Sequence, residues 1–238
     1  MTFDFINWVF PRQCITCWTT GAYLCKNCKK KLKPHPEICP VCHRFSKNYK
    51  TCLNCKPEKE NVLEWIIIPF VYDDQLKKLI IKLKYFHKKD IGGFLVERLK
   101  IALQANQSFS NLEFQISNSK IFITRIPTHR WREYFIKGYN QSKILVKELS
   151  KITDIPRIEI AKKQKHTKTQ ASLDRVWRLK NLKNTFSLLP ELPFTGNETL
   201  LIVDDITTTW ATINELAKLI KQQFPKIKVR WAVLWRHT

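Results

Sequence analysis

The sequence predicts an α/β fold with a mostly parallel sheet, preceded by a cysteine-rich N-terminal module. Short apolar segments alternate with amphipathic helical patterns after the cysteines, and this alternation is typical of a parallel sheet. All eight cysteines lie between Cys14 and Cys55, in four CxxC pairs. We therefore expect two domains, residues 1–60 and residues 61–238, with the charged stretch KPEKE after the last cysteine at their boundary.

The composition is that of a folded and strongly basic protein. Apolar residues make up 44% of the 238 residues, so a core can form and global disorder is excluded. The formal net charge of +22 favours an anionic partner, although a lysine-rich solvated surface would give the same charge. No apolar stretch reaches the roughly 20 residues that span a bilayer. The N-terminus lacks the basic start of a signal peptide, so we expect a cytoplasmic protein.

The cysteine pairs predict two structural Zn²⁺ sites. Two residues between cysteines allow both sulfurs to reach one tetrahedral ion, and two such pairs complete a closed four-cysteine site. Disulfides are the alternative, but four CxxC pairs without a secretory signal favour metal. The simplest pairing is sequential, and the spacing also permits an interleaved one. The expected ligands are Cys14, Cys17, Cys25, Cys28, Cys39, Cys42, Cys52 and Cys55.

The first part of the α/β region contains one expected strand and two expected helices. WIIIPFVY, residues 65–72, has the composition of a buried strand. Residues 75–89 place apolar residues three and four apart among lysines, which predicts an amphipathic helix. Its lysines form either a solvated surface or part of an anion-binding face. A second helix is expected from about residue 92 to beyond residue 103, before a polar connection over residues 105–120.

The middle of the chain continues the alternation. IFITRIP, residues 121–127, predicts a strand that its proline ends, and residues 140–150 predict the following helix. The segment between them interleaves cations, among them Arg130, with aromatic residues. Such a combination can bind a nucleic-acid backbone and stack bases, although a loop with buried aromatic residues is the alternative. RIEIA, residues 157–161, predicts a short strand.

A basic segment and two further strands complete the sheet. Residues 162–186 are polar and rich in lysine and hydroxyl groups, which predicts a mobile loop. LLIV, residues 200–203, predicts a short buried strand, followed by a helix that begins near residue 210. KVRWAVLW, residues 228–235, alternates little and predicts a buried strand that closes the sheet.

The segment LLIVDDITTTWAT, residues 200–212, gives the strongest indication of function. The carboxylates of Asp204 and Asp205 directly follow the expected strand, and a turn rich in hydroxyl groups leads into the helix. Backbone N–H groups and the helix dipole favour a phosphate in such a turn. The carboxylates can accept hydrogen bonds from ribose hydroxyls or hold Mg²⁺ through water. An ordinary strand, turn and helix is the alternative.

This segment resembles the motif that binds phosphoribosyl pyrophosphate (PRPP) in type I phosphoribosyltransferases. The whole chain resembles the ComF/GntX family, because FPRQC, FVYDDQLKKLIIKLKY and IPTHRWREYFIKGYNQSKIL precede the motif in the order of that family. The resemblance implies a zinc module joined to a domain of the type I phosphoribosyltransferase kind. It implies catalytic roles for Asp204 and Asp205 and Mg²⁺ bound with PRPP. The implied PRPP-binding residues are Thr207, Thr208, Thr209, Trp210, Ala211, Thr212, Lys165 and Arg130.

The same family includes proteins of natural transformation. The resemblance therefore implies a protein that binds PRPP or a nucleotide-like ligand and handles single-stranded DNA. A ComF-type helicase would be a partner, at the inner face of the membrane with the DNA-uptake machinery. Two alternatives remain open: an active phosphoribosyltransferase with an unknown acceptor, and a non-catalytic zinc-dependent adaptor with a degenerate PRPP site.

Tryptophan stands at two positions where the motifs have glycine. Trp210 replaces the glycine of the PRPP motif, and Trp18 directly follows a CxxC pair, where zinc knuckles commonly have glycine. The chain has five glycines and eight tryptophans. We hypothesise that both positions are UGA codons which the organism reads as glycine, and UGG codons in the gene would refute this. A genuine tryptophan at the motif position should weaken PRPP binding, because an indole crowds the phosphate turn.

Overall fold

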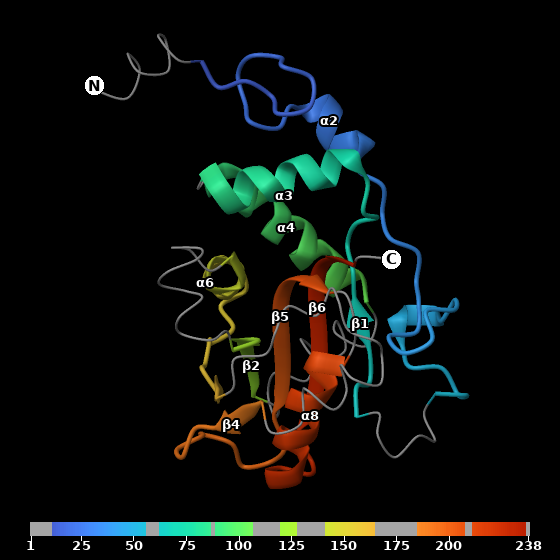
Figure 1. Ribbon diagram of the computed structural model, residues 1–238, viewed down its shortest axis with the longest axis vertical. Coiled ribbons are helices and arrows are strands. Elements are labelled where there is room, and N and C mark those ends of the chain that lie inside the picture. The colour runs from blue at the N-terminus through green and yellow to red at the C-terminus, as the bar shows by residue number, and fades with distance from the viewer. Residues whose placement is uncertain are drawn as a thin grey trace.

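The computed structural model confirms the predicted α/β fold with a parallel sheet (Figure 1). Helices cover both faces of the sheet, and two cysteine-rich segments precede it. Among the helices that the structure describes, none is long and apolar enough to cross a membrane. The structure describes residues 11–55, 62–86, 89–106, 120–127, 141–164, 185–207 and 211–236.

Four strands form the main sheet, and all of them run parallel in the order β1–β6–β5–β2. The longest pairing joins β5 to β6, from Thr199 opposite Lys228 to Thr207 opposite Arg236. On its other side β5 pairs with β2 along the whole of β2. The bounds are β1 Ile66–Ile67, β2 Ile121–Arg125, β5 Thr199–Thr207 and β6 Lys228–Arg236.

Two apolar cores hold helices against the two faces of the sheet. One core joins α3, α4 and α6 to the face that carries Leu201 and Val203. The other joins α8 to the face that carries Leu200 and Ile202. Alternate residues of β5 therefore face opposite helix layers, as a strand buried on both sides requires. The helices are α3 Asp74–Phe86, α4 Lys89–Ala105, α6 Gln141–Thr153 and α8 Ala211–Gln223.

The last strand lies inside the sheet. The prediction for residues 228–235 is confirmed by β6, which is buried from Val229 to Trp235. It lies between β1 and β5, however, and does not close an edge. Its apolar run from Trp231 to Trp235 accounts for this position, because both faces of an interior parallel strand are covered by helices.

Two of the expected strands differ from the structure. The strand expected over residues 65–72 is reduced to Ile66–Ile67, because Pro69 lacks the N–H that continued pairing needs. The strand expected over residues 157–161 is a single parallel bridge between Arg157 and Ile123 of β2. An unpredicted antiparallel hairpin follows it, formed by β3 Ala161–Lys163 and β4 Phe186–Leu188.

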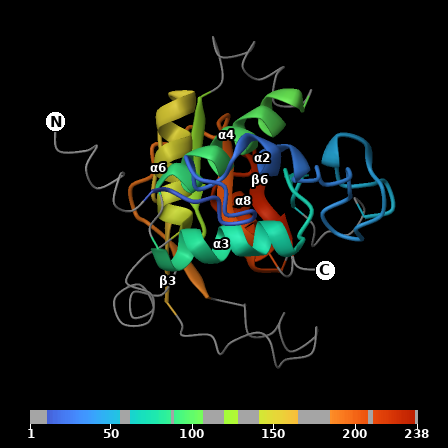
Figure 2. The same cartoon turned by 90° about the horizontal axis from the view of Figure 1, so that it is seen from above.

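The cysteine-rich segments contact the α/β body at separate places. The first contains α2 (Lys26–Lys31) and receives a hydrogen bond of 2.6 Å from the Gln75 side chain of α3 to the carbonyl oxygen of Cys28. Figure 2 shows α2 next to α4, where the Lys29 ammonium lies 5.0 Å from the centre of the Phe94 ring. The second contains the 3₁₀ turn η1 (Lys47–Tyr49) and bridges to the chain just before β1.

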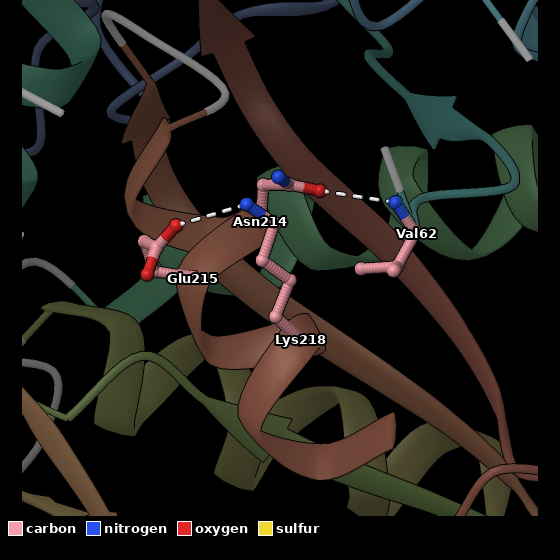
Figure 3. A network of polar contacts seen from close by, with 4 residues as sticks. All are labelled: Val62, Asn214, Glu215 and Lys218. Carbon is pink, nitrogen blue, oxygen red and sulfur yellow. Dashed lines mark hydrogen bonds and ion pairs between the residues drawn. The ribbon is translucent and has the colours of Figure 1, made fainter. Parts of the chain in front are cut away.

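The division into residues 1–60 and 61–238 stays a prediction, because the expected boundary falls at residues 56–61, outside the described residues. The chain immediately after this boundary is attached to α8. The amide of Val62 donates a hydrogen bond of 3.2 Å to Oδ1 of the buried Asn214 (Figure 3). One residue further along α8, Glu215 forms an ion pair of 3.3 Å with Lys218. The first of these contacts ties the chain before β1 to the first turn of α8, and the second lies within α8.

Candidate functional site

The eight cysteines form two clusters, each able to hold one metal ion. Within each cluster the four sulfur atoms lie within 4.8 Å of one another. The pairing is sequential, as the simplest interpretation of the spacing predicts, and not interleaved. The clusters are Cys14, Cys17, Cys25 and Cys28, and then Cys39, Cys42, Cys52 and Cys55.

The distances within these clusters suit tetrahedral zinc. The Sγ atoms of Cys17 and Cys25 are 3.5 Å apart, and those of Cys42 and Cys52 are 3.7 Å apart. A zinc ion with Zn–S bonds of about 2.3 Å requires sulfurs about 3.8 Å apart in a tetrahedral site. Four cysteines leave no open ligand position, so these sites could hold structural zinc.

In each cluster, hydrogen bonds to some of the sulfurs favour the thiolate form that metal binding needs, although burial raises the pKa of Cys28 and Cys55. The Thr19 hydroxyl lies 3.1 Å from the sulfur of Cys17, and hydrogen bonds from the Thr19 side chain and backbone lower the pKa of Cys17 to about 6. The backbone amide of Cys25 also donates to the sulfur of Cys14 over 3.5 Å. In the second cluster, the amide of Cys52 donates to the sulfur of Cys39 over 3.4 Å. Amide donors to ligand sulfurs are expected in zinc knuckles, because they stabilise negative charge.

The acidic pair lies inside β5, not after it. The strand was expected to end at residue 203, but β5 continues to Thr207 because it stays paired with β6 up to Arg236. Asp204 and Asp205 are therefore held by sheet hydrogen bonding at the carboxyl end of the strand. Ser142 of α6 contacts both carboxylates.

Ser142 fixes the orientation of the acidic pair. Its hydroxyl donates a hydrogen bond of 2.6 Å to Oδ1 of Asp204 and lies 3.4 Å from Oδ1 of Asp205. The backbone amide of Asp205 donates to the same oxygen of Asp204 over 2.9 Å. Ser142 is buried in the first turn of α6, so the N-terminus of this helix lies beside the carboxylates. The sequence interpretation did not identify Ser142, although a hydroxyl residue at an expected helix start is a usable signal.

The electrostatics of the pair favour a ligand that binds carboxylates. Burial raises the pKa of Asp204 well above its ordinary value, and the neighbouring charge of Asp205 raises it further. The N-terminus of α6 lies at the pair, and α8 begins at Ala211, four residues after the end of β5. The partial positive charge at helix N-termini attracts anions. A sugar hydroxyl or a hydrated cation would suit the carboxylates. A phosphate next to it would suit the N-terminus of α8.

Only part of the predicted PRPP-binding set falls on described residues. Thr207 is the last residue of β5, and Ala211 and Thr212 begin α8, so the predicted strand and the predicted helix are both present. The roles of these residues stay predictions. The other predicted ligands lie outside the described residues: Arg130, Lys165, Thr208, Thr209 and Trp210.

Comparison with known proteins identifies several relatives that extend over most of the chain. No family model matches it. The chain is similar to competence protein F of Haemophilus influenzae, with 32% identity over 204 residues, which is 84% of each chain. It is also similar to DNA utilization protein YhgH of Escherichia coli strain K12, with 27% identity over 199 residues and 83% of each chain. The YhgH protein of Salmonella typhimurium is 26% identical over 200 residues, again 83% of each chain.

Proposed function

Because this chain belongs to the family of competence protein F, we propose that it acts in the uptake and use of DNA. In this proposal, Asp204 and Asp205 bind a phosphoribosyl compound, either PRPP or a related nucleotide-like molecule. The basic surface holds single-stranded DNA. The names of the relatives support the DNA role, and the net charge of +22 supports binding of a polyanion.

The observation that carries the phosphoribosyl proposal is the fixed acidic pair between two helix N-termini. Ser142 holds Asp204 by a hydrogen bond of 2.6 Å, so the carboxylates are oriented before a ligand arrives. The ribose hydroxyls of the ligand would donate hydrogen bonds to these carboxylates. Its 5′-phosphate would bind at the start of α8, where backbone amides can contact phosphate oxygens.

Magnesium fits the same arrangement. Mg²⁺ prefers carboxylate oxygens and usually keeps several waters, and it binds phosphates at the same time. Burial and, after it, the neighbouring charge of Asp205 raise the pKa of Asp204, and a bound cation would offset both effects. We therefore expect the phosphoribosyl compound to bind together with Mg²⁺.

Two other functions use the same residues differently. In an active phosphoribosyltransferase, Mg²⁺ and basic residues such as Lys165 and Arg130 would stabilise the departing pyrophosphate. In a zinc-dependent adaptor, the acidic pair would be a relic, and Trp210 at the glycine position of the motif favours this alternative. Release of pyrophosphate in the presence of a nucleobase would identify the enzyme.

The partners and the location follow from the same proposal. A DNA-uptake protein of this family would work in the cytoplasm, at the inner face of the membrane, where single-stranded DNA arrives. A ComF-type helicase would deliver that strand. Copurification of the two proteins in the presence of single-stranded DNA would test this partnership, and two proteins that stay separate would contradict it.

Isothermal titration calorimetry on zinc-loaded protein tests the phosphoribosyl site. Mg²⁺ and PRPP should bind the wild-type chain, and the Asp204→Ala/Asp205→Ala variant should lose binding. Ser142→Ala should weaken binding about tenfold, because it removes a hydrogen bond to a charged group. The variant Asp154→Asn/Glu191→Gln removes two exposed charges elsewhere and serves as the matched control. Equal PRPP binding by the acidic-pair variant and this control would reject the site.

A further inference from the structure

A basic pocket lies at the outer edge of the sheet, next to the acidic pair but formed by other residues. Its volume is about 270 Å³. The pocket lies between the first turns of α6, the carboxyl end of the edge strand β2, and the segment that runs beside β2. Its lining residues are Arg125, Lys143, Val146, Arg157, Ile158 and Glu159.

The backbone explains why these residues meet. Arg125 is the last residue of β2 and follows Ile123 on the strand face that packs against α6. The amide of Ile123 donates to the carbonyl of Pro156, and the amide of Ile158 donates to the carbonyl of Ile123. These bonds of 2.9 and 2.8 Å hold residues 156–158 along the outer edge of β2. The pocket is therefore built on sheet and helix positions.

Three cations and one carboxylate line the pocket, and they are not equally exposed. The Arg125 guanidinium pairs with Glu159 over 3.1 Å. The Arg125 side chain is 15% exposed, whereas the Glu159 side chain is 67% exposed. The carboxylate can therefore turn into solvent while the guanidinium stays in place. An ion pair with one exposed partner contributes little to stability, so another anion can replace Glu159 at small cost.

We propose that this pocket binds a backbone phosphate of single-stranded DNA. The Arg125 fork takes two phosphate oxygens, Lys143 and Arg157 contact the same group from either side, and Glu159 turns outward. This inference rests on the proposed DNA-handling function and assigns it a place in the fold. A guanidinium fork matches phosphate geometry, and the apolar walls Val146 and Ile158 suit the carbon atoms of a deoxyribose.

The position of the pocket relates it to the proposed phosphoribosyl site. Arg125 pairs in the sheet with Val203, two residues before Asp205. On α6, Ser142 binds Asp204 while the next residue, Lys143, lines the pocket. A DNA strand with a phosphate in the pocket would therefore pass beside the acidic pair, and the two ligands would use different side chains.

Fluorescence anisotropy of a labelled oligothymidylate tests the pocket on full-length, zinc-loaded protein. Arg157→Gln should weaken binding about tenfold, the effect of one lost charged hydrogen bond. It should also lower the slope of log affinity against log salt by about 0.7, the value for one phosphate of a single strand. Lys147→Gln removes an exposed cation from the same helix outside the pocket and is the matched control.

The carboxylate gives the sharper test, because its variant keeps every cation. Glu159→Gln should tighten DNA binding severalfold, since the phosphate no longer competes with a charge for Arg125. Misfolding cannot produce such a gain. Glu191→Gln removes an exposed carboxylate elsewhere and should leave affinity unchanged. If Glu159→Gln binds no tighter than Glu191→Gln, and Arg157→Gln no weaker than Lys147→Gln, the proposal is overturned.

Two further measurements separate this inference from the proposed function. Arg157→Gln should bind Mg²⁺ and PRPP like the wild type, and Asp204→Ala/Asp205→Ala should still bind the oligonucleotide. Inorganic pyrophosphate is the second probe: if the pocket variants weaken its binding but leave DNA binding at control values, the pocket holds a free phosphate compound and the inference fails. A wild-type chain that binds no single-stranded DNA would instead contradict the DNA-handling function itself.

Discussion

Trp18 and His43 adopt the same left-handed backbone conformation, with φ angles of 64° and 63°. Each directly follows the second cysteine of a CxxC pair, and each donates its amide to the carbonyl oxygen of the first cysteine of that pair. The two cysteine clusters therefore repeat one local turn. A residue with a Cβ atom is strained in this conformation, whereas glycine is not.

The shared turn predicts that Trp18→Gly stabilises the protein by about 1 kcal/mol, the usual cost of a left-handed residue with a side chain. The indole is 72% exposed, so its removal costs little burial. Urea unfolding in the presence of zinc measures the change. His43→Gly is the matched comparison and should gain less, because the His43 ring contacts Arg236 over 2.7 Å. Equal or lower stability of Trp18→Gly would contradict the prediction.

The two metal sites should differ in what they stabilise. Cys14 and Cys28 are buried in the same apolar core as α3 and α4, whereas Cys39 and Cys55 form a small cluster of their own with Val41. We expect Cys17→Ser to lower the free energy of unfolding of the α/β body more than Cys42→Ser does. The difference between the two variants should be about 2 kcal/mol or more.

Circular dichroism melting and the zinc content of each variant check this expectation. Wild-type protein should contain two zinc ions per chain, and each variant should lose one. If both variants melt alike with one ion each, the first site is not coupled to the main core.

The acidic pair should lower the free energy of unfolding of the protein at neutral pH. The raised pKa of Asp204 means that its ionised form is disfavoured in the folded state. Asp204→Asn keeps an oxygen for the Ser142 hydrogen bond and removes both the cost of burying a charge and the repulsion from Asp205, so it should stabilise the protein at pH 8. We expect a gain of about 1 kcal/mol, within the usual range for a single substitution.

The pH dependence of this gain has a fixed sign. An acid with a raised folded pKa destabilises the native state above that pKa and has no effect below its ordinary value of 3.8, where both states are protonated. The advantage of Asp204→Asn should therefore fade as the pH decreases through the raised pKa. Denaturant unfolding at several pH values measures it, and a constant advantage down to pH 3.8 would disagree.

Glu198 should act in the opposite direction. Burial raises its pKa, but three hydrogen bonds from Thr195 and Gly196 outweigh this effect and lower the pKa below the ordinary value of 4.5. Its stabilisation is therefore present above pH 4.5 and lost as the pH falls through the lowered value. Glu198→Gln should cost about 2 kcal/mol at pH 7, the usual effect of losing hydrogen bonds to a charged group.

Thermal unfolding of Glu198→Gln and wild type at pH 7 and in acid checks this prediction. The difference between them should shrink in acid, where the wild-type carboxyl is also neutral. Glu191→Gln, an exposed change a few residues earlier, should have no effect at either pH. A loss at pH 7 that persists unchanged in acid would indicate a packing effect and not the charge.

The parts of the fold predicted from the sequence are those whose signals are local. The apolar run of β6 and the helical spacing of α8 are complete within their own segments, and so is the CxxC spacing. The end of β5 was predicted too early, because Asp204 and Asp205 interrupt the apolar run, whereas pairing with β6 continues to Thr207.

The missed features depend on contacts between distant segments. The partner of Ser142 lies 62 residues away, so no local pattern connects the hydroxyl to Asp204. The strands of the β3–β4 hairpin have three residues each, too few to show alternation. The basic pocket combines Arg125, Lys143 and Arg157 from three segments, and their meeting depends on the sheet edge.

The position of β6 inside the sheet has a consequence for the order in which the protein folds on the ribosome. The chain emerges from its N-terminus, so β1, α3, α4 and β2 leave the exit tunnel before β5. β5 can add to β2 at once, but β1 pairs with β6 in the main sheet and must wait for the last of these strands. Until residues 231 and 232 have emerged, the apolar residues Ile66 and Ile67 lack their partner strand in that sheet. Nascent chains of this protein should therefore need protection from aggregation until synthesis has passed β6.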